Sequence, residues 1–533
     1  MERFEKSSLW RSTLAPQDED DDLTSKKREE LRQAYYQLRS RISDLVKDIP
    51  SDIKGFTIHD ETHLDALWDL ASIIAGPDYK FTPAEGFVMG GAILIHDAGM
   101  ALMAHPLGRA ELRTDEKWLD TLALLWRNKT GNYATSADLS PGGIATKDAE
   151  LTQQADAEVL RSRHAQRAED LLFKTWTLNS GESYSLLDNK SLKENYGWLI
   201  GQIAGSHWWP IDELPRKFNK KRGAPGEFPQ TWTVDPLVLA CLLRTADAAH
   251  LDERRAPKFL QALRKPHGVS KQHWEFQSRL LQPILLPSNL LQFSSSSPFP
   301  VSENASWWLA YEALNIVDQE LRSVDALITE SGRVRFEARG VGHVSSPTYL
   351  SQTVEASGWS PVDTRVRVGD AVKLALTLGG RQLYGAGKLV PLRELIQNAS
   401  DAVRARRLLQ RRPENWGDVT IKLSPPSPGV DDWLLEVEDN GIGMSEAVLR
   451  GPFLDFGASF WGSWASLDEH PSLSTLGFQS VGGFGIGFYS VFMWASRVCV
   501  RTRHYESAAE ATLVLEFQNG LNTNPLLRQA ERD

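Results

Sequence analysis

The spacing of apolar residues divides the chain into a helical part and a mixed part. Over residues 51–256, apolar positions recur with the period of an α-helix, and almost no stretch alternates apolar and polar residues as a strand does. A further helix is predicted upstream, over residues 25–47, behind an acidic run at residues 18–22. We therefore expect an acidic tail and a helix in residues 1–50, and an all-α domain in residues 51–256.

The pattern changes after residue 256. A turn-rich piece at residues 293–300 interrupts the chain, an amphipathic helix follows over residues 305–329, and residues 333–339 resemble a strand. We interpret residues 257–364 as a mixed α+β connector between two domains.

Strands and helices alternate from about residue 365 onward. Runs of apolar and β-branched residues predict strands at 419–423, 433–438 and 498–502. This alternation predicts an α/β domain over residues 365–533. A multidomain chain is also expected from its 533 residues, because one hydrophobic core rarely serves more than roughly 300 residues.

Composition narrows the classes of function. A formal net charge of −10 disfavours a protein that mainly coats nucleic acid, although a local basic patch stays open. Two cysteines, Cys241 and Cys499, cannot form a disulfide framework or a four-cysteine zinc site. The N-terminus lacks the apolar segment of a signal peptide, and the most membrane-like stretch, residues 87–104, contains His96 and Asp97. We expect a cytosolic protein that does not enter a membrane.

The first candidate functional motif of the predicted α/β domain lies in a predicted helix. The motif reads Arg393-Glu-Leu-Ile-Gln-Asn-Ala-Ser-Asp-Ala402. Glu394, Asn398 and Asp401 are spaced by four and three residues, so they share one helix face. Taken alone, an Asn on a helix is usually a surface residue, but three polar groups on one face indicate a site.

Two glycine-rich motifs follow. One, Glu438-Asp-Asn-Gly-Ile-Gly-Met444, puts a carboxylate and two glycines at a strand end, which suits a purine edge but is also common in turns. The other, Gly482-Gly-Phe-Gly-Ile-Gly-Phe488, precedes a predicted helix at 489–495 and can turn backbone N–H groups toward phosphate. It is not a dinucleotide fingerprint, because Ser490 replaces the third glycine, and residues 385–388 lack the spacing of a P-loop.

In this order, the three motifs resemble those of the Bergerat-type (GHKL) ATPase fold, which DNA gyrase, histidine kinases, MutL and the ninety-kilodalton heat-shock chaperone share. The first and third motifs are most similar to the chaperone branch. The resemblance implies a two-layer α/β domain that binds ATP with Mg²⁺, and it makes residues 445–481 a mobile lid.

The resemblance also implies a role for each position. Asn398 would coordinate Mg²⁺, Glu394 would orient or deprotonate the attacking water, and Asp439 would accept a hydrogen bond from the adenine amino group. The other implied cofactor contacts are Asp401, Gly441, Gly443, Met444, Gly483, Phe484, Gly485, Ile486, Gly487 and Phe488.

The chain departs from this family in two ways. No Gly-Thr pair that would close the adenine pocket follows the third motif, and the middle domain that donates an arginine to the phosphates is missing. These departures leave three alternatives: a fragment of a longer protein, slow hydrolysis, or hydrolysis that needs a partner.

Histidines in the helical part point to a metal. His59 and His63, four residues apart, invite a comparison with zinc proteases, but Asp60 stands where those enzymes need Glu. A wider pattern fits better, since His63 opens a helix, His96-Asp97 sits in an apolar helix, and Asp247 lies in another. A buried His-Asp pair needs a partner, and a metal is the natural one.

The order of these residues, H…HD…D, resembles the HD superfamily of metal-dependent phosphohydrolases over about residues 51–256. His164 and His207 match its optional middle ligands, although His164 could also be a surface position. The implied metal ligands are His63, His96, Asp97, His164, His207 and Asp247. With all six, two divalent metals become plausible, with Asp97 bridging them and serving catalysis.

We therefore predict an ATP-regulated metal-dependent phosphohydrolase that acts on a nucleotide or another phosphoester. The fusion of two such domains hints at bacterial stress or antiphage defence, and the chaperone resemblance implies a homodimer or higher oligomer. The alternative is a chaperone-like or signalling ATPase whose HD domain only binds a nucleotide or a protein. A DNA-remodelling ATPase is disfavoured by the acidic charge.

Overall fold

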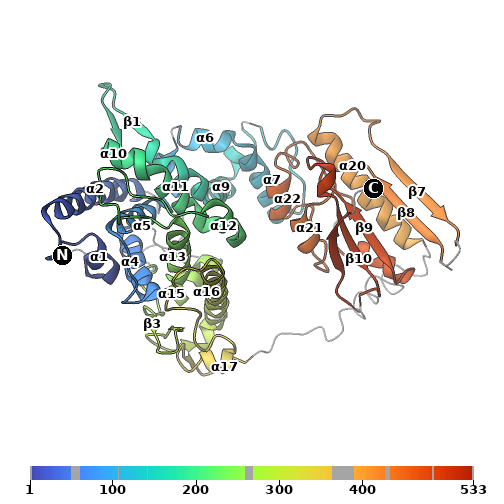
Figure 1. The fold of residues 1–533 in the computed structure, drawn as a ribbon. Helices are drawn as coiled ribbons and strands as arrows, with labels where there is room; N and C mark the ends of the chain where they lie inside the picture. The colour runs from blue at the N-terminus through green and yellow to red at the C-terminus, as the bar shows by residue number, and fades with distance from the viewer. Residues whose placement is uncertain are drawn as a thin grey trace. The chain divides into compact units, whose positions relative to one another are not determined.

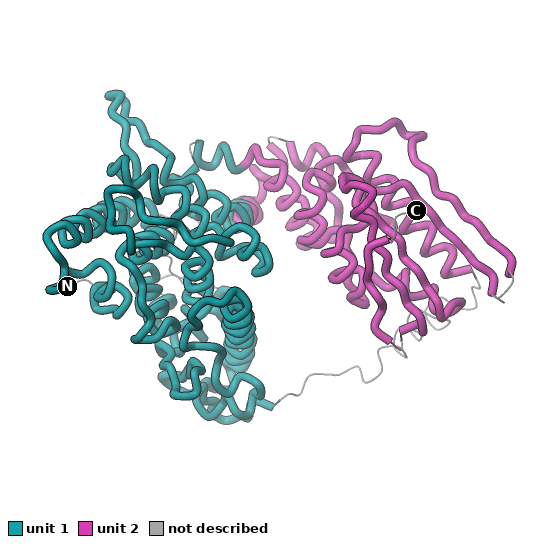
Figure 2. The backbone as a smooth tube through the Cα atoms, in the orientation of Figure 1, with its two compact units in different colours: residues 1–112, 156–364 teal, residues 113–155, 365–533 magenta. Residues whose placement is uncertain are grey.

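The computed structural model forms two compact units (Figure 2). One unit contains residues 1–112 and 156–364, and the other contains residues 113–155 and 365–533. The described residues are 3–47, 49, 60–105, 107–140, 142–257, 268–362, 389–426, 432–482, 485–521 and 523–530. Among the helices of these ranges, none has the length and apolar composition that a membrane crossing requires.

The first unit is mainly helical (Figure 1). Its helices are α1 (Ser8–Thr13), α2 (Asp22–Val46), α4 (Glu61–Ala75), α5 (Pro83–Ile95), α10 (Lys190–Leu192), α11 (Trp198–Gly205), α12 (Leu214–Lys217), α13 (Pro236–Ala249), α15 (Gly268–Gln277), α16 (Asn304–Glu330) and α17 (Pro347–Leu350). Its strands are short: β1 (Thr175–Thr177), β2 (Ser183–Ser185), β3 (Ile284–Leu285), β4 (Leu291–Gln292), β5 (Phe299–Pro300) and β6 (Ala356–Ser357). The helices predicted at 25–47 and 305–329 are confirmed as α2 and α16.

Helix α5 is the centre of this unit. All its residues are buried, because its sequence is apolar on every side, and it packs against α2, α4, α11 and α13. Its start is defined by a capping box, in which the Thr82 hydroxyl accepts from the Glu85 N–H and the Glu85 carboxylate accepts from the Thr82 N–H.

The end of α5 differs from the prediction. His96 and Asp97 were expected inside an apolar helix, but α5 ends at Ile95, and Asp97 begins the 3₁₀ helix η2 (Ala98–Met100). The physical reason is a close approach: Gly99 lies directly against the backbone of His164, where a Cβ would not fit. The turn places the His-Asp pair at the helix end, where both side chains are still buried.

The connector region packs within the first unit. Helix α16 contacts α13 and α15, and Trp307 donates a hydrogen bond to the Val354 carbonyl. The strand predicted at 333–339 is wrong, because this stretch forms no ladder. Two of its N–H groups instead donate to the last carbonyls of α4, Glu337 to Ala75 at 3.3 Å and Ala338 to Ile74 at 3.0 Å.

The second unit mixes helices and strands. Its elements are α7 (Glu116–Thr130), α8 (Ile144–Lys147), α20 (Val390–Leu409), α21 (Glu446–Arg450), α22 (Trp464–Glu469), β7 (Val419–Ser424), β8 (Leu434–Asp439), β9 (Val498–Thr502), β10 (Leu513–Phe517) and β11 (Leu526–Gln529). The three strands predicted from the sequence are confirmed as β7, β8 and β9. The helix predicted at 489–495 is a 3₁₀ helix, η9 (Phe488–Met493).

Two small antiparallel sheets accompany α20 in this unit. Strands β7 and β8 pair with each other, and β10 lies between β9 and β11. Helix α20 packs against β7, β8 and η9 (Figure 1). The helix thereby contacts segments between residues 419 and 493 of the predicted α/β domain.

Two helices contain residues of both units, so each crosses a unit boundary in the sequence. Helix α6 (Arg109–Thr114) leads out of the first unit, and α9 (Ala149–Asp170) leads back into it. Between them, α7 packs against α22. The carboxylate of Asp120 accepts from the N–H groups of Ser472 and Thr475, and Lys117 pairs with Asp468 at 2.8 Å.

We predict that Gly90→Val destabilises the first unit. A Cβ at Gly90 would lie 2.6 Å from the Trp68 ring and 2.8 Å from the Tyr35 ring. Overpacking of this kind costs about 3 kcal/mol, so calorimetry of the full chain should show the first unit melting several degrees lower. Gly223→Val is the control, because nothing lies within 4 Å of that position. Equal melting temperatures for the two variants would contradict this packing.

Candidate metal centre and nucleotide site

Four predicted ligands of the helical domain meet at one point. His63 comes from the first turn of α4, His96 and Asp97 from the end of α5, and Asp247 from the last turn of α13. The Nε2 atoms of His63 and His96 lie 3.4 and 3.2 Å from Asp97 Oδ2, and both lie 3.8 Å from Asp247 Oδ1. These side chains therefore converge closely enough to surround one cation.

A second group shares the same aspartate. His164, on α9, approaches Asp97 Oδ1 at 3.4 Å, and His207, on the 3₁₀ helix η6 (Ser206–Trp208), lies 3.0 Å from His164 between Nε2 atoms. His164 is 1% exposed, so it is not the surface residue that the alternative reading allowed. The two oxygens of Asp97 thus face two different sets of histidines.

Backbone carbonyls orient three of the histidines in the same way. The Nδ1 atoms of His96, His164 and His207 lie 2.8, 2.5 and 2.5 Å from the carbonyl three residues earlier. A nitrogen that faces a carbonyl carries a proton, so each of these rings turns its Nε2 away from the backbone and into the cluster. Metal-bound histidines are oriented by backbone carbonyls in the same way.

The electrostatics of the cluster favour a cation. Burial lowers the pKa of His63 and of His164, and burial together with His96 lowers the pKa of His207 to about 4. Burial acts on His96 in the same direction, but the Asp97 and Asp247 carboxylates outweigh it and raise its pKa to about 10. The carboxylates therefore retain a proton on His96, and a divalent cation would replace that proton.

The donor set fits a metal of the zinc, manganese or nickel class. Imidazole nitrogens and carboxylate oxygens are the ligands of such ions. The buried Oδ1 atom of Asp247 makes no hydrogen bond within the described ranges, although Arg255 Nη1 lies 3.5 Å from it, and His63 and His96 face it at 3.8 Å. A cation between the two histidines would meet this oxygen. Buried histidines that face one another without a cation stabilise each other little, so the cluster is best explained as a metal-binding site.

One residue of this centre was missed by the sequence analysis. His250 is fully buried and its Nδ1 lies 2.7 Å from Nδ1 of His63. Behind it, Asp252 lies 3.6 Å from His250 and 2.6 Å from Arg254, which also bonds to Asp69. His250 therefore orients His63. Its position three residues after Asp247 is the one signal that could have indicated it.

The zinc-protease alternative finds no support in the packing. His63 is used by the cluster around Asp97, while His59 lies outside the described residues. The arrangement is that of the wider H…HD…D pattern.

In the second unit, α20 brings the first and third predicted motifs together. Gly487 lies so close to the Glu394 carboxylate that a Cβ there would displace it, and a Cβ at Gly482 would lie 3.4 Å from Asn398 Oδ1. Asp401 is fully buried and accepts hydrogen bonds from the N–H groups of Val481 and Gly482, both at 2.9 Å. Asp401 therefore positions the glycine-rich loop.

The second motif also packs against α20. Gly441 meets the backbone of Ala402, and the Ile442 N–H donates to the Ala402 carbonyl at 3.1 Å. The Asp439 carboxylate accepts from the Gly441 N–H at 2.8 Å, and burial raises its pKa. Gly443 has a φ of +65° and touches the backbone of Arg503, so only glycine fits there.

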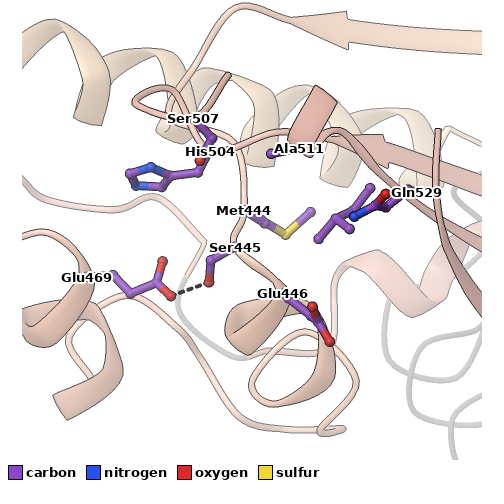
Figure 3. A pocket seen from close by; sticks show the side chains of 9 residues that line it. Met444, Ser445, Glu446, Glu469, His504, Ser507, Ala511 and Gln529 are labelled. Carbon is purple, nitrogen blue, oxygen red and sulfur yellow. Dashed lines mark hydrogen bonds between the residues drawn. The ribbon is translucent and has the colours of Figure 1, made fainter. Parts of the chain in front are cut away.

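Of the remaining predicted cofactor contacts, some lie within the described residues and others do not. Gly485 adopts a φ of +66° against Ala458, and Ile486 and Phe488 continue from it into η9. Gly483 and Phe484 lie outside the described residues. A cavity of about 390 Å³ is lined by Met444, whereas Glu394, Asn398 and Asp439 are not among its lining residues (Figure 3).

Parts of this chain are similar to heat-shock chaperones. The mitochondrial heat shock protein of 75 kDa from Bos taurus is 36% identical over 138 residues, which are 26% of this chain and 19% of that protein. The chaperone protein HtpG of Serratia proteamaculans is 37% identical over 143 residues, 26% of this chain and 22% of HtpG. HtpG of Klebsiella pneumoniae is 38% identical over 180 residues, 30% of this chain and 28% of HtpG. The chain thus spans less than a third of the length of each of these relatives.

A sequence model of the HD-CE family matches residues 53–323, just over half of the chain. This range contains the six predicted ligands around Asp97 and also His250. The protein therefore joins an HD domain to a region similar to the ninety-kilodalton heat-shock chaperones. By the extent of the match, the chain belongs to the HD-CE family.

Proposed function

We propose that this protein is a metal-dependent phosphohydrolase whose activity depends on ATP bound by its chaperone-like region. The observation that carries the proposal is Asp97, whose two oxygens face two separate groups of metal-ligand side chains. A pure binding domain has no need of such a bridge. The fusion itself is our reason for placing the activity in bacterial stress or antiphage defence and in the cytosol.

The proposed chemistry needs two cations. When bound, paired metal ions lower the pKa of a shared water and polarise a phosphoryl oxygen. On the protein side, His63, His96 and Asp247 would hold one ion, His164 and His207 the other, and Asp97 both. The substrate would be a nucleotide or another phosphoester, and Arg161, whose carbonyl orients His164, is our candidate for contacting its phosphate.

For the second unit we propose ATP binding in a Bergerat-type fold. Asp439 would accept from the adenine amino group, Asn398 would coordinate Mg²⁺, and Glu394 would orient the attacking water. Helix α20 carries the first motif, and the packing of the second and third motifs on it supports this proposal. Gly441, Gly443, Gly485 and Gly487 would let the backbone approach the nucleotide.

We further propose that residues 113–155 couple the two activities. Helix α7 holds the segment 472–475 through Asp120, and this segment belongs to the proposed lid. The same stretch of chain runs directly into α9, which carries His164. A lid that changes its contacts with ATP can thereby bias the metal centre through differential contacts, typically worth about 1–3 kcal/mol.

The second candidate function is a chaperone-like or signalling ATPase whose HD domain only binds a nucleotide or a protein, and the similarity to HtpG favours it. Under this second candidate, the protein would still bind ATP and form a dimer or higher oligomer. It differs in predicting no phosphohydrolase turnover at Asp97, so the next experiment separates the two.

We predict that Asp97→Asn lowers the content of divalent metal and abolishes phosphohydrolase activity, because an amide cannot bridge two cations as a carboxylate does. The assay is a screen of nucleotides and cyclic dinucleotides with Mn²⁺, Mg²⁺, Ni²⁺ and Zn²⁺, with metal measured by elemental analysis. Asp78→Asn, at an exposed position, is the matched control. A metal-free wild-type protein with activity indifferent to chelators would favour the second candidate.

We predict that Asp439→Asn weakens ATP binding by about 1–2 kcal/mol or more, because the amide can present a donor to the adenine amino group. Glu394→Ala should instead retain ATP and lose hydrolysis. Calorimetric titration and phosphate release measure the two effects. Unchanged ATP affinity in Asp439→Asn would show that adenine binds elsewhere.

We predict that a non-hydrolysable ATP analogue changes the phosphohydrolase rate or the oligomeric state, and that Asp120→Ala removes this response. ATP affinity and metal content should stay unchanged, since Asp120 is not among the predicted ligands. Asp138→Ala, at a half-buried position in the same inserted segment where the carboxylate accepts hydrogen bonds from Thr135, is the control. Identical kinetics and sedimentation of the wild type with and without the analogue would show that the two regions are only tethered.

The Asp120 contact should also depend on pH. Burial raises the Asp120 pKa to about 6, above its value of about 3.9 in an unfolded chain. The stability from this group is therefore fully present below about pH 4 and is lost as pH rises through about 6. Asp120→Asn should remove this part of the pH dependence of thermal unfolding, whereas Asp138→Asn should leave it.

A further inference from the structure

A second cluster of metal-ligand side chains lies in the second unit. Ligand atoms of Glu469, His470 and His504 all lie within 4.8 Å of one another. None of the three belongs to the predicted metal centre or to the predicted nucleotide contacts. Glu469 and His504 lie at the same end of the cavity in Figure 3.

The three residues come from two segments that the backbone holds in place. Glu469 ends α22 and His470 caps it, with the His470 N–H bonded to the Ser466 carbonyl at 2.9 Å. His504 follows β9, where the next residue, Tyr505, donates its N–H to the Ile442 carbonyl at 2.9 Å. The donors are therefore brought together before any ligand binds.

The side chains leave donor atoms available for a cation. His470 is 2% exposed, and its Nδ1 is buried with no hydrogen-bond partner in the described ranges. The rings of His470 and His504 are nearly parallel, at 7°, with centroids 5.3 Å apart. Glu469 accepts from the Ser445 hydroxyl through Oε1, which leaves Oε2. A buried imidazole nitrogen without a partner is costly, and a bound metal would remove that cost.

We propose that Glu469, His470 and His504 form a zinc site. Two imidazoles and one carboxylate are a zinc donor set, with the fourth position left to water or another ligand from the cavity. Atoms bound to one tetrahedral zinc lie roughly 3.3 Å apart, so only small side-chain movements are needed. Mg²⁺ is excluded as the preferred ion, because it selects oxygen ligands.

The site would connect the proposed lid to the strand behind the second motif. Glu469 and His470 belong to residues 445–481, whereas His504 follows β9 and Ser445 adjoins Met444. Zinc would hold these segments together independently of ATP. The proposal does not depend on the proposed function, because none of its three residues is a proposed ligand of the HD metals or of ATP.

The test uses the full chain with the HD cluster disabled by His96→Ala, Asp97→Asn and His164→Ala. After chelation, the protein is titrated with Zn²⁺, and bound zinc is measured by elemental analysis. We expect one tightly bound zinc ion per chain in this background. We expect its loss in His470→Gln, Glu469→Gln and His504→Gln, and its retention in His470→Cys, because thiolate is also a zinc ligand.

Glu506→Gln, at an exposed position near His504, is the control and should keep the zinc. Circular dichroism reports whether each variant is folded, and the partly exposed Glu469 and His504 decide the outcome if His470→Gln does not fold. In the chain with an intact HD cluster, the same substitutions should lower the zinc content by the same single ion. Absence of tight zinc in the disabled background, or zinc content indifferent to all three substitutions, would overturn the proposal.

Discussion

The arrangement of the first unit depends on one carboxylate. Asp97 lies where the end of α5 meets α4, α9 and α13, and its two oxygens approach histidines from opposite sides at 3.2–3.4 Å. A buried carboxylate is stable only with cationic or hydrogen-bonding partners. The apolar helix α5 carries this group into the core, and α4 and α9 bring His63 and His164 to its two oxygens.

Helix α20 has the corresponding position in the second unit. Its polar face contacts the glycine-rich loop through Asp401, and Ala402 supports the second motif through Ile442. Because glycines at 441 and 443 leave no room for side chains, the second motif lies directly on the helix and on the backbone of Arg503. The same close packing that builds the fold therefore brings the three motifs together.

The segment 113–155 lies in one domain by sequence match but packs with the other compact unit. It lies within the range of the HD-CE match, yet it packs with the chaperone-like region, and both helices that lead into it cross the unit boundary. Asp120 is its strongest anchor, since it is fully buried and accepts two backbone hydrogen bonds. An inserted segment of this kind gives a physical basis for coupling that a flexible linker does not.

The sequence by itself determined the local features of this protein. Helical periodicity predicted α2 and α16, β-branched runs predicted β7, β8 and β9, and the spacing of His63, His96-Asp97 and Asp247 identified residues that the fold brings together. The helices and strands were predictable because periodicity depends on neighbours along the chain, whereas the distant ligands were identified through the H…HD…D order of a known family. Only the tertiary structure decided that α5 stops before His96, that His250 orients His63, that residues 113–155 join the second unit, and that His470 meets His504. Each of these results from contacts between residues far apart in sequence, where close packing and burial, rather than local propensity, determine the conformation.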